Sequence, residues 1–355
     1  MTPLGLNPGP LSMLKSAFIV GAKRTPFGAF GGKLKTLSAT ELGVLASKAA
    51  LTHAKVSPNM IEEVFYGNVI QTSLDACYLS RHVALKLATC ITHFNLPHCR
   101  SGTPIKTPAL TVNRLCGSGF EAACLAAESI QLGRVSVVLA GGTENMSAAP
   151  MLIDGLAARH GVALGKGLQA QDSLWAGLTD SHAGFPMGMT AENLASKFGV
   201  TREQCDEYSL RSQQLWKKAH DAGVFQAEIA PVEVKGRKGP EAVAVDEHPR
   251  PETTLEGLAK LKPVFKEGGV VTAGTASGIS DGAASLIIAS EEACSSSNLT
   301  PMARMVAWSR VGCDPSIMGI GPVEVIREAL RRANLKLEDM GMLAHYLLLK
   351  LLYIL

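Results

Sequence analysis

The chain has 355 residues, of which 46% are apolar, 18% are charged and 5% are aromatic. This composition is typical of a globular protein, and the length suffices for one large domain or two smaller ones. The net charge of +3 gives no electrostatic reason to expect nucleic-acid binding, and no apolar run is long enough to span a membrane. The 35 glycines favour tight turns and closely packed α/β layers over an all-β sandwich.

The cysteines and the first charged residues indicate the cellular compartment of the protein. Eight cysteines are scattered along a chain without a recognisable secretory signal, so we expect reduced thiols inside the cell. Five basic residues precede the first acidic residue, Glu41. A basic stretch without acidic residues permits mitochondrial import, although serine and arginine are not enriched in it.

The first third of the chain predicts the order strand, helix, helix, strand. Residues 17–20 form an apolar run typical of a buried strand. Ser38 and Glu41 have the spacing of a capping box and predict the start of a long helix. Pro58 permits a second, short helix, and residues 63–70 predict the next strand.

Residues 107–147 predict a strand, a cysteine-containing turn, a helix and a second strand. The first strand leads into Cys116, the segment 120–133 has helical composition, and the buried strand 135–147 contains a Gly-Gly pair. This alternation is typical of an α/β fold.

The segment 147–269 predicts a large excursion from the sheet. Helices are expected at 190–200 and 204–225, between loops rich in glycine and proline. Such excursions often build substrate sites. The chain returns through the Gly/Ser-rich stretch 270–290, which predicts a loop followed by a strand or helix.

The C-terminal part predicts a second pass through the opening arrangement. We expect a strand at 303–313 and a helix beginning at Gly321 and Pro322, and residues 333–349 weakly repeat residues 54–70. The expected fold is therefore α/β with two related βαβαβ halves. The second half is expected to be truncated, since a sheet needs several strands to cover its helices.

Cys116 is the candidate nucleophile. Most isolated free cysteines are buried and act as small hydrophobic residues, and that alternative stays open for Cys116. However, the thiolate is the reactive form, and the dipole and free N–H groups of a helix N-terminus stabilise it. Gly117 and Gly119 would let a substrate approach the backbone, where the following N–H groups could bind an oxyanion.

Six segments, taken in this order, resemble the thiolase family. They are NRLCGSGF (113–120), GGTENMS (141–147), GLTDSHAGFPMGMTAENLA (177–195), VDEHPRPETT (245–254), TAGTASGISDGAA (272–284) and GCDPSIMGIGP (312–322). The pattern is most similar to the mitochondrial 3-ketoacyl-CoA thiolase, or acetyl-CoA C-acyltransferase, type. It extends from about residue 15 to Met340.

The resemblance implies an acyltransferase of fatty-acid β-oxidation in the mitochondrial matrix. Cys116 would take the acyl group from a 3-ketoacyl-CoA and release acetyl-CoA, after which CoA would remove the acyl group. Arg250, Thr253 and Ser277 match positions that contact CoA in the family. Coenzyme A is then a substrate, and no cofactor or metal is expected. A homodimer or homotetramer is implied as well.

The family pattern is lost after Met340. The NEAFA, GHP and CxGGG segments of thiolases, which supply an Asn, a His and a second Cys, do not occur in the printed sequence. His345 lies in the divergent tail, and His82, His182 and His248 do not match the catalytic base. Because general acid and base groups contribute about 10²–10⁴-fold each, we expect impaired turnover.

Two further departures lie inside the pattern. A segment at about 88–103 looks like an insertion and contains Cys90, His93, His98 and Cys99. A zinc site is the less favoured interpretation, because His98 and Cys99 are adjacent, and a surface loop is preferred. Thr275 stands where the family usually has Asn.

The expected domains are an N-terminal extension (1–14), a thiolase N-terminal domain (15–295, with a loop domain at about 147–269) and a truncated C-terminal domain (296–355). Two alternatives to an active thiolase remain open. One is an inactive thiolase-like subunit that acts by oligomerisation. The other is a cysteine hydrolase, which is less favoured because no histidine has a matching motif.

Overall fold

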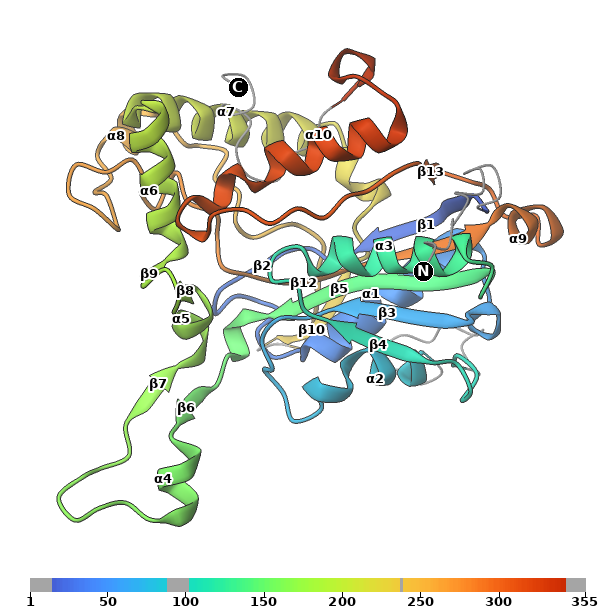
Figure 1. Ribbon diagram of the computed structural model, residues 1–355, viewed down its shortest axis with the longest axis horizontal. Coiled ribbons are helices and arrows are strands. Elements are labelled where there is room, and N and C mark those ends of the chain that lie inside the picture. The colour runs from blue at the N-terminus through green and yellow to red at the C-terminus, as the bar shows by residue number, and fades with distance from the viewer. Residues whose placement is uncertain (1–14, 88–101, 237–238, 343–355) are drawn as a thin grey trace, which may run out of the picture.

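The computed structural model describes residues 15–87, 102–236 and 239–342, and its centre is one mixed seven-stranded sheet (Figure 1). The strand order is β13-β1-β12-β5-β3-β4, and β2 pairs with β12. The strands are β1 (Ala17–Arg24), β2 (Gly28–Ala29), β3 (Glu63–Gly67), β4 (Ala109–Val112), β5 (Val137–Asn145), β12 (Ser280–Ser290) and β13 (Ala303–Met305).

Strand directions bring several loops to one edge of this sheet. β3 runs parallel to both β4 and β5, whereas β12 runs antiparallel to β5 and to β1. The C-terminal ends of β1, β3, β4 and β5 therefore lie at the same edge as the N-terminal end of β12. We call this the carboxyl edge.

Helices cover both faces of the sheet (Figure 1). α1 (Ala39–Ala54) and α2 (Leu79–Lys86) pack on one face, and α3 (Ser118–Gln131) packs on the other. The predicted capping box begins α1, since Glu41 N donates to Ser38 Oγ and Ser38 N donates to the Glu41 carboxylate. That prediction is confirmed.

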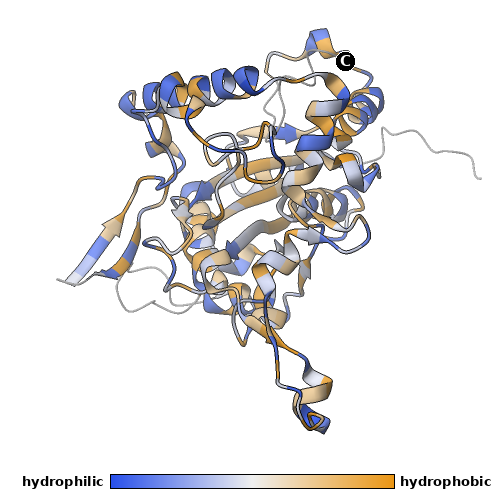
Figure 2. Cartoon of the chain, turned by 90° about the vertical axis from the view of Figure 1, so that its left-hand side faces the viewer, coloured by the Kyte–Doolittle hydropathy of each residue, from blue (hydrophilic) through white to orange (hydrophobic). Residues whose placement is uncertain are grey.

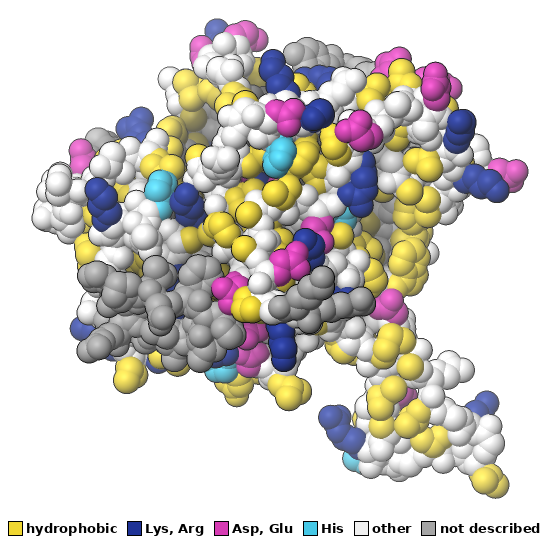
Figure 3. Space-filling model, turned by 180° about the vertical axis from the view of Figure 1, so that it is seen from behind, with side chains coloured by type: hydrophobic (Ala, Val, Ile, Leu, Met, Phe, Trp, Pro, Cys, Tyr) yellow, Lys and Arg dark blue, Asp and Glu magenta, His cyan; other side chains and the backbone are white. Residues whose placement is uncertain are grey.

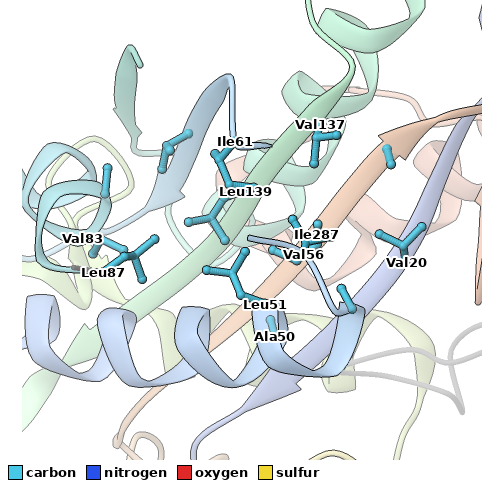
Figure 4. Packing of buried hydrophobic residues seen from close by; sticks show 14 of the residues in the cluster. Val20, Ala50, Leu51, Val56, Ile61, Val83, Leu87, Val137, Leu139 and Ile287 are labelled. Atoms are coloured by element: carbon cyan, nitrogen blue, oxygen red, sulfur yellow. The ribbon is translucent and has the colours of Figure 1, made fainter. Parts of the chain in front are cut away.

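Consecutive residues of each buried strand contribute to opposite cores. Leu139 and Ile287 lie in the core beneath α1 and α2, which Figure 4 shows, whereas Val138 and Ile288 lie in the core beneath α3. This alternation is the period of two that a strand imposes on its side chains. Both faces are apolar because both are covered, so the strands read as continuous hydrophobic runs.

The excursion carries further helices and three small hairpins, and α9 (Glu291–Ser296) follows β12. The helices are α4 (Gly155–His160), α5 (Ser173–Gly177), α6 (Met187–Phe198), α7 (Arg202–Asp221) and α8 (Leu255–Ala259). The hairpins are β6 (Met151–Ile153) with β7 (Ala170–Asp172), β8 (Thr179–Asp180) with β9 (Phe185–Pro186), and β10 (Val232–Gly236) with β11 (Gly239–Val243). β6, α4 and β7 form an arm that extends away from the rest of the molecule in Figures 1 and 2.

The last described segment crosses the outer side of α3. The predicted strand at 303–313 is wrong beyond Met305, because Trp308 and Arg310 turn towards α3 instead of extending the sheet. Trp308 Nε1 donates to Glu128 at 2.9 Å, and Arg310 donates to Glu121 at 2.9 Å and to Glu128 at 2.7 Å. The predicted helix is confirmed as α10 (Gly321–Ala333).

The core makes a testable prediction at Leu139. Its side chain is fully buried, so Leu139→Ala should leave a cavity and lower the free energy of unfolding by about 2–5 kcal/mol. Urea unfolding measures the loss. Leu74→Ala is the matched control, because Leu74 is fully exposed, and it should change the value by less than about 0.5 kcal/mol. Equal losses in the two variants would contradict this account of the core.

A second prediction concerns the pH dependence of stability. Burial raises the pKa of the Glu121 carboxyl, but Arg310 and Arg114 outweigh it, and the pKa is lowered overall. A lowered pKa in the folded state adds stability above the unfolded value of about 4.3, and this stability is lost as the pH falls through the folded value. Glu121→Gln should therefore cost about 1–2 kcal/mol at pH 7 and less below pH 4.

Urea unfolding at several pH values tests this prediction. Glu324→Gln is the control, since Glu324 forms an exposed pair with Arg327 and should have little effect at any pH. A Glu121→Gln deficit that persists unchanged below pH 4 would refute the ionic origin of the contact.

Candidate active site

Cys116 lies in a tight turn between β4 and α3, at the carboxyl edge. Ser118 Oγ accepts a hydrogen bond from Arg114 N at 2.8 Å and donates one to Leu115 O at 2.6 Å. Asn113 Oδ1 accepts a hydrogen bond from Leu115 N at 2.9 Å, as in an Asx turn. Side chains before and after Cys116 therefore fix the turn.

Leu115 holds an uncommon backbone conformation directly before Cys116. Its φ is +47°, in the left-handed region, which costs a residue with a Cβ roughly 1–2 kcal/mol. Such outliers cluster at functional sites, where surrounding contacts maintain them. Cys116 itself is exposed, so the alternative of a buried structural cysteine is wrong.

Glycines let the N-terminal end of α3 approach the sheet. A Cβ on Gly67 of β3 would lie 2.5 Å from Ser118 C and 2.7 Å from Gly119 N. A Cβ on Gly142 of β5 would lie 3.3 Å from Gly119 Cα. The turn that carries Cys116 is thus seated directly above the ends of β3 and β5.

The predicted position of Cys116 near a helix N-terminus is confirmed, but two of the expected oxyanion donors are already occupied. Cys116 precedes α3 by two residues, near the positive end of the helix dipole. By contrast, burial raises the pKa of Cys124, within α3, to about 11. The amides of Gly117 and Ser118 already donate to Arg114 O and Leu115 O, so an oxyanion would need other donors.

Arg250 and Thr253 share one loop. Arg250 Nη1 donates to the carbonyls of Glu247, His248 and Pro249 at 2.6–3.0 Å. Thr253 Oγ1 donates to Arg250 O at 2.6 Å. None of the described residues accepts a hydrogen bond from Arg250 Nε or Nη2, which leaves one side of the guanidinium exposed.

The loop with Ser277 lies against the loop with Arg250. His248 Nε2 is 3.0 Å from Ile279 O, and a Cβ on Gly278 would lie 2.2 Å from the His248 ring. Ser277 is exposed and lies three residues before the start of β12. The structure thus brings Arg250 and Ser277 to neighbouring loops at the carboxyl edge. Among the described residues, no hydrogen bond joins these loops to the Cys116 turn.

Thr275 and Glu192 stabilise the same region, and the sequence had not indicated their roles. Thr275 Oγ1 accepts from Thr272 N at 2.8 Å and donates to Val270 O at 3.0 Å. Glu192 of α6 is buried and accepts the amides of Val270 and Val271 at 3.0 and 2.8 Å. The departure from Asn at position 275 therefore retains a side chain that closes the loop.

The sequence motifs also gave no indication of the apolar side chains that pack against the loop at residues 270–275 and against α6. A Cβ on Gly274 would lie 2.4 Å from Leu258 Cδ2 and 2.7 Å from Leu261 Cδ1. A Cβ on Gly188 of α6 would lie 2.1 Å from the Phe265 ring. Gly188 in segment 177–195 and Gly274 in segment 272–284 could have indicated these contacts, because a glycine often marks a place where another part of the chain approaches the backbone closely.

None of the histidines that the structure describes forms a hydrogen bond with Cys116. His82 Nδ1 pairs with Asp75 at 2.9 Å, His248 faces Ile279 O, and His182 lies on an exposed turn. His345 lies outside the described residues, as do Cys90, His93, His98 and Cys99.

Within 15–87, 102–236 and 239–342, no group of His, Cys, Asp or Glu side chains has the geometry of a metal site. No helix in these ranges is both long and apolar enough to cross a membrane.

Comparisons with known proteins agree with the motifs. The family model for the thiolase N-terminal domain matches residues 17–292, and that for the thiolase C-terminal domain matches residues 299–345. The mitochondrial 3-ketoacyl-CoA thiolase of Homo sapiens is 52% identical, with 94% of this chain and 80% of that protein covered. The acetyl-CoA acetyltransferase of Syntrophomonas wolfei is 40% identical, with 93% and 80% covered.

A solved structure has the same fold. The crystal structure of human mitochondrial 3-ketoacyl-CoA thiolase in complex with CoA is 52% identical, with a TM-score of 0.85 over 93% of this chain and 78% of that chain. The expected α/β fold is confirmed as a thiolase fold with a central mixed sheet. The chain belongs to the thiolase family and is a thiolase-type acyltransferase.

Proposed function

We propose that the chain cleaves 3-ketoacyl-CoA with CoA and forms acetyl-CoA and a shortened acyl-CoA. The observation that carries this proposal is the exposed thiol of Cys116, which follows a left-handed residue at the start of α3. Relatives named 3-ketoacyl-CoA thiolase and acetyl-CoA acetyltransferase support the same chemistry.

The reaction would proceed through an acyl group on Cys116. The thiolate attacks the 3-keto carbon, the bond between C2 and C3 breaks, and its electron pair stays on C2, which takes a proton to give acetyl-CoA. The thiol of CoA then loses its proton and attacks the acyl carbon, and Cys116 leaves as a thiolate, so that the proton released here balances the one taken up by C2. This is two-step covalent catalysis with one nucleophile.

Arg250, Thr253 and Ser277 are the proposed contacts to CoA. The exposed side of the Arg250 guanidinium suits a phosphate, which guanidinium groups bind by paired hydrogen bonds. Thr253 and Ser277 add hydroxyls on the same pair of loops. CoA acts here as a substrate, and the proposal requires no further cofactor.

The proposed domains are an N-terminal extension (1–14), an N-terminal domain (15–295) with its loop domain, and a C-terminal domain that begins at about 296.

Intact-protein mass spectrometry after mixing with acetoacetyl-CoA tests the nucleophile. We expect an acetyl adduct on the wild type and on Cys77→Ser, in which another exposed thiol is removed, but none on Cys116→Ser. Adding CoA should remove the adduct. A folded wild type that forms no adduct would overturn the proposal and favour an inactive thiolase-like subunit.

We further propose that the chain forms a homodimer or homotetramer, in which the arm takes part. Large apolar side chains run along it, as Figure 3 shows from behind, and they are Met151, Leu152, Ile153, Leu156, Val162, Leu164 and Leu168. Exposed apolar surface of this extent is typical of a protein–protein contact.

Light scattering tests the role of the arm. Leu156→Glu with Leu164→Glu should lower the molar mass of the oligomer at a fixed concentration, because buried carboxylates destabilise an apolar interface. Leu74→Glu, at an exposed site outside the arm, is the control and should not change it. An unchanged mass in the arm variant would contradict its role in assembly.

The proposed location is the mitochondrial matrix. The basic N-terminal stretch and the mitochondrial relatives support it. A C-terminal fluorescent fusion should overlap with a matrix marker, and a diffuse cytosolic signal would contradict the assignment.

A further inference from the structure

Glu144 is a half-buried carboxylate at the carboxyl edge that acyl transfer does not use directly. It is the penultimate residue of β5, and its oxygens accept three hydrogen bonds. The donors are Asn68 Nδ2 at 3.0 Å, Val69 N at 2.9 Å and Ile70 N at 3.1 Å. Two consecutive backbone amides therefore point at one carboxylate and fix the loop that follows β3.

One peptide group of that loop connects Glu144 to the Cys116 turn. Ile70 N–H donates to Glu144, and the carbonyl of the same peptide, Val69 O, accepts from Asn113 Nδ2 at 3.3 Å. Because a trans peptide is planar with its N–H and C=O pointing in opposite directions, fixing one side fixes the other.

Asn113 connects the Val69–Ile70 peptide to Leu115, the residue before Cys116. While its Nδ2 is held by Val69 O, its Oδ1 accepts Leu115 N at 2.9 Å. Leu115 has the positive φ that places Cys116. A left-handed residue with a Cβ persists only when its surroundings stabilise it, and this hydrogen bond contributes to that stabilisation beside the contacts of Ser118 to Leu115 O.

We propose that Glu144 and Asn113 are positioning residues that act through the Val69–Ile70 peptide to hold Leu115 left-handed and Cys116 aimed at the substrate. The inference rests on the proposed function, because it assigns a role relative to Cys116 as the nucleophile. The role assigned to both residues is to position Cys116 and not to bind CoA, so their loss should slow acylation of Cys116 without weakening CoA binding.

The first test removes the hydrogen bond between Asn113 and Leu115 N, and then replaces Leu115 by glycine, which adopts a positive φ without that bond. Asn113 is exposed, so Asn113→Ala should fold, and it should slow acetyl transfer from acetoacetyl-CoA by about 10- to 100-fold, as expected for a misplaced nucleophile. The dissociation constant for CoA should stay within about twofold. Adding Leu115→Gly should restore most of the rate, because glycine adopts a positive φ without support.

These results decide the role of Asn113. A wild-type acylation rate in Asn113→Ala would overturn the proposal. A slow rate that Leu115→Gly leaves unchanged would also overturn it, since the defect would then not lie in the backbone conformation at 115. A general structural defect would not be rescued by glycine at this one position.

The second test places Glu144 in the same chain of contacts. Glu144→Gln turns an acceptor into an N–H₂ group that faces amide donors, so it should slow acylation in the same direction. The double variant with Asn113→Ala should be no slower than Asn113→Ala alone, because the two residues act through one path. Rate losses that multiply would overturn the role of Glu144.

Glu62→Gln is the matched control. Glu62 also accepts a backbone amide, that of Ser136, but at the opposite end of β5. It should acylate at the wild-type rate. Equal slowing in Glu62→Gln and Glu144→Gln would show that the effect is not specific to the carboxyl edge and would overturn the proposal.

Alkylation by iodoacetamide separates this inference from the proposed function. If the wild type fails to acylate but Cys116 still reacts with iodoacetamide, the proposed function fails and the same variants are compared by alkylation rate. Slower alkylation in Asn113→Ala, restored by Leu115→Gly, would still support the positioning role, and an unchanged rate would overturn it.

Discussion

The position of Cys116 depends on the close approach of α3 to the ends of β3 and β5. Gly67 and Gly142 allow this approach, because any Cβ at Gly67 would overlap the backbone of Ser118 and Gly119. The helix therefore begins at the sheet itself. In the turn before it Leu115 adopts a left-handed conformation and Cys116 remains exposed.

The same edge collects groups that are far apart in the sequence. The start of β12 brings Ser277 there, and the end of β1 brings the loop of Arg250, since Arg24 pairs with Asp246 at 2.7 Å. On the outer side, Arg310 and Trp308 bind Glu121 and Glu128 of α3. One helix thus carries the Cys116 turn at its start and anchors the C-terminal segment along its length.

Buried polar groups within the layers fix how the sheet and helices meet. Tyr66 is fully buried, and its hydroxyl lies at hydrogen-bond distance from Ser47 and Ser285 and donates to Gly43 O. Burial raises its pKa to about 12, so it stays neutral at physiological pH. Such satisfied networks favour one arrangement of packed layers over others. The hydrogen-bonded turn that carries Cys116 keeps its geometry because the sheet beneath the carboxyl edge is rigid.

Much of the fold and the main candidate residue could be predicted from the sequence. Apolar periodicity and capping signals located β1, α1, β5, α6, α7 and α10, since these are local properties of the chain. The glycine-flanked Cys116 and the ordered motifs indicated a thiolase before any geometry was known. By contrast, local signals could not show that Trp308 leaves the sheet for α3, because its partner Glu128 is 180 residues away.

The sequence by itself therefore determined the α/β class and the family, and it singled out Cys116 as the candidate nucleophile, because these depend on residue type and short-range spacing. Only the tertiary structure decided how Cys116 is presented. The Val69–Ile70 peptide, which contacts both Glu144 and Asn113, joins segments 74 and 44 residues away in the sequence. Pairing between β3 and β5, and the glycines that let α3 touch them, bring these segments together.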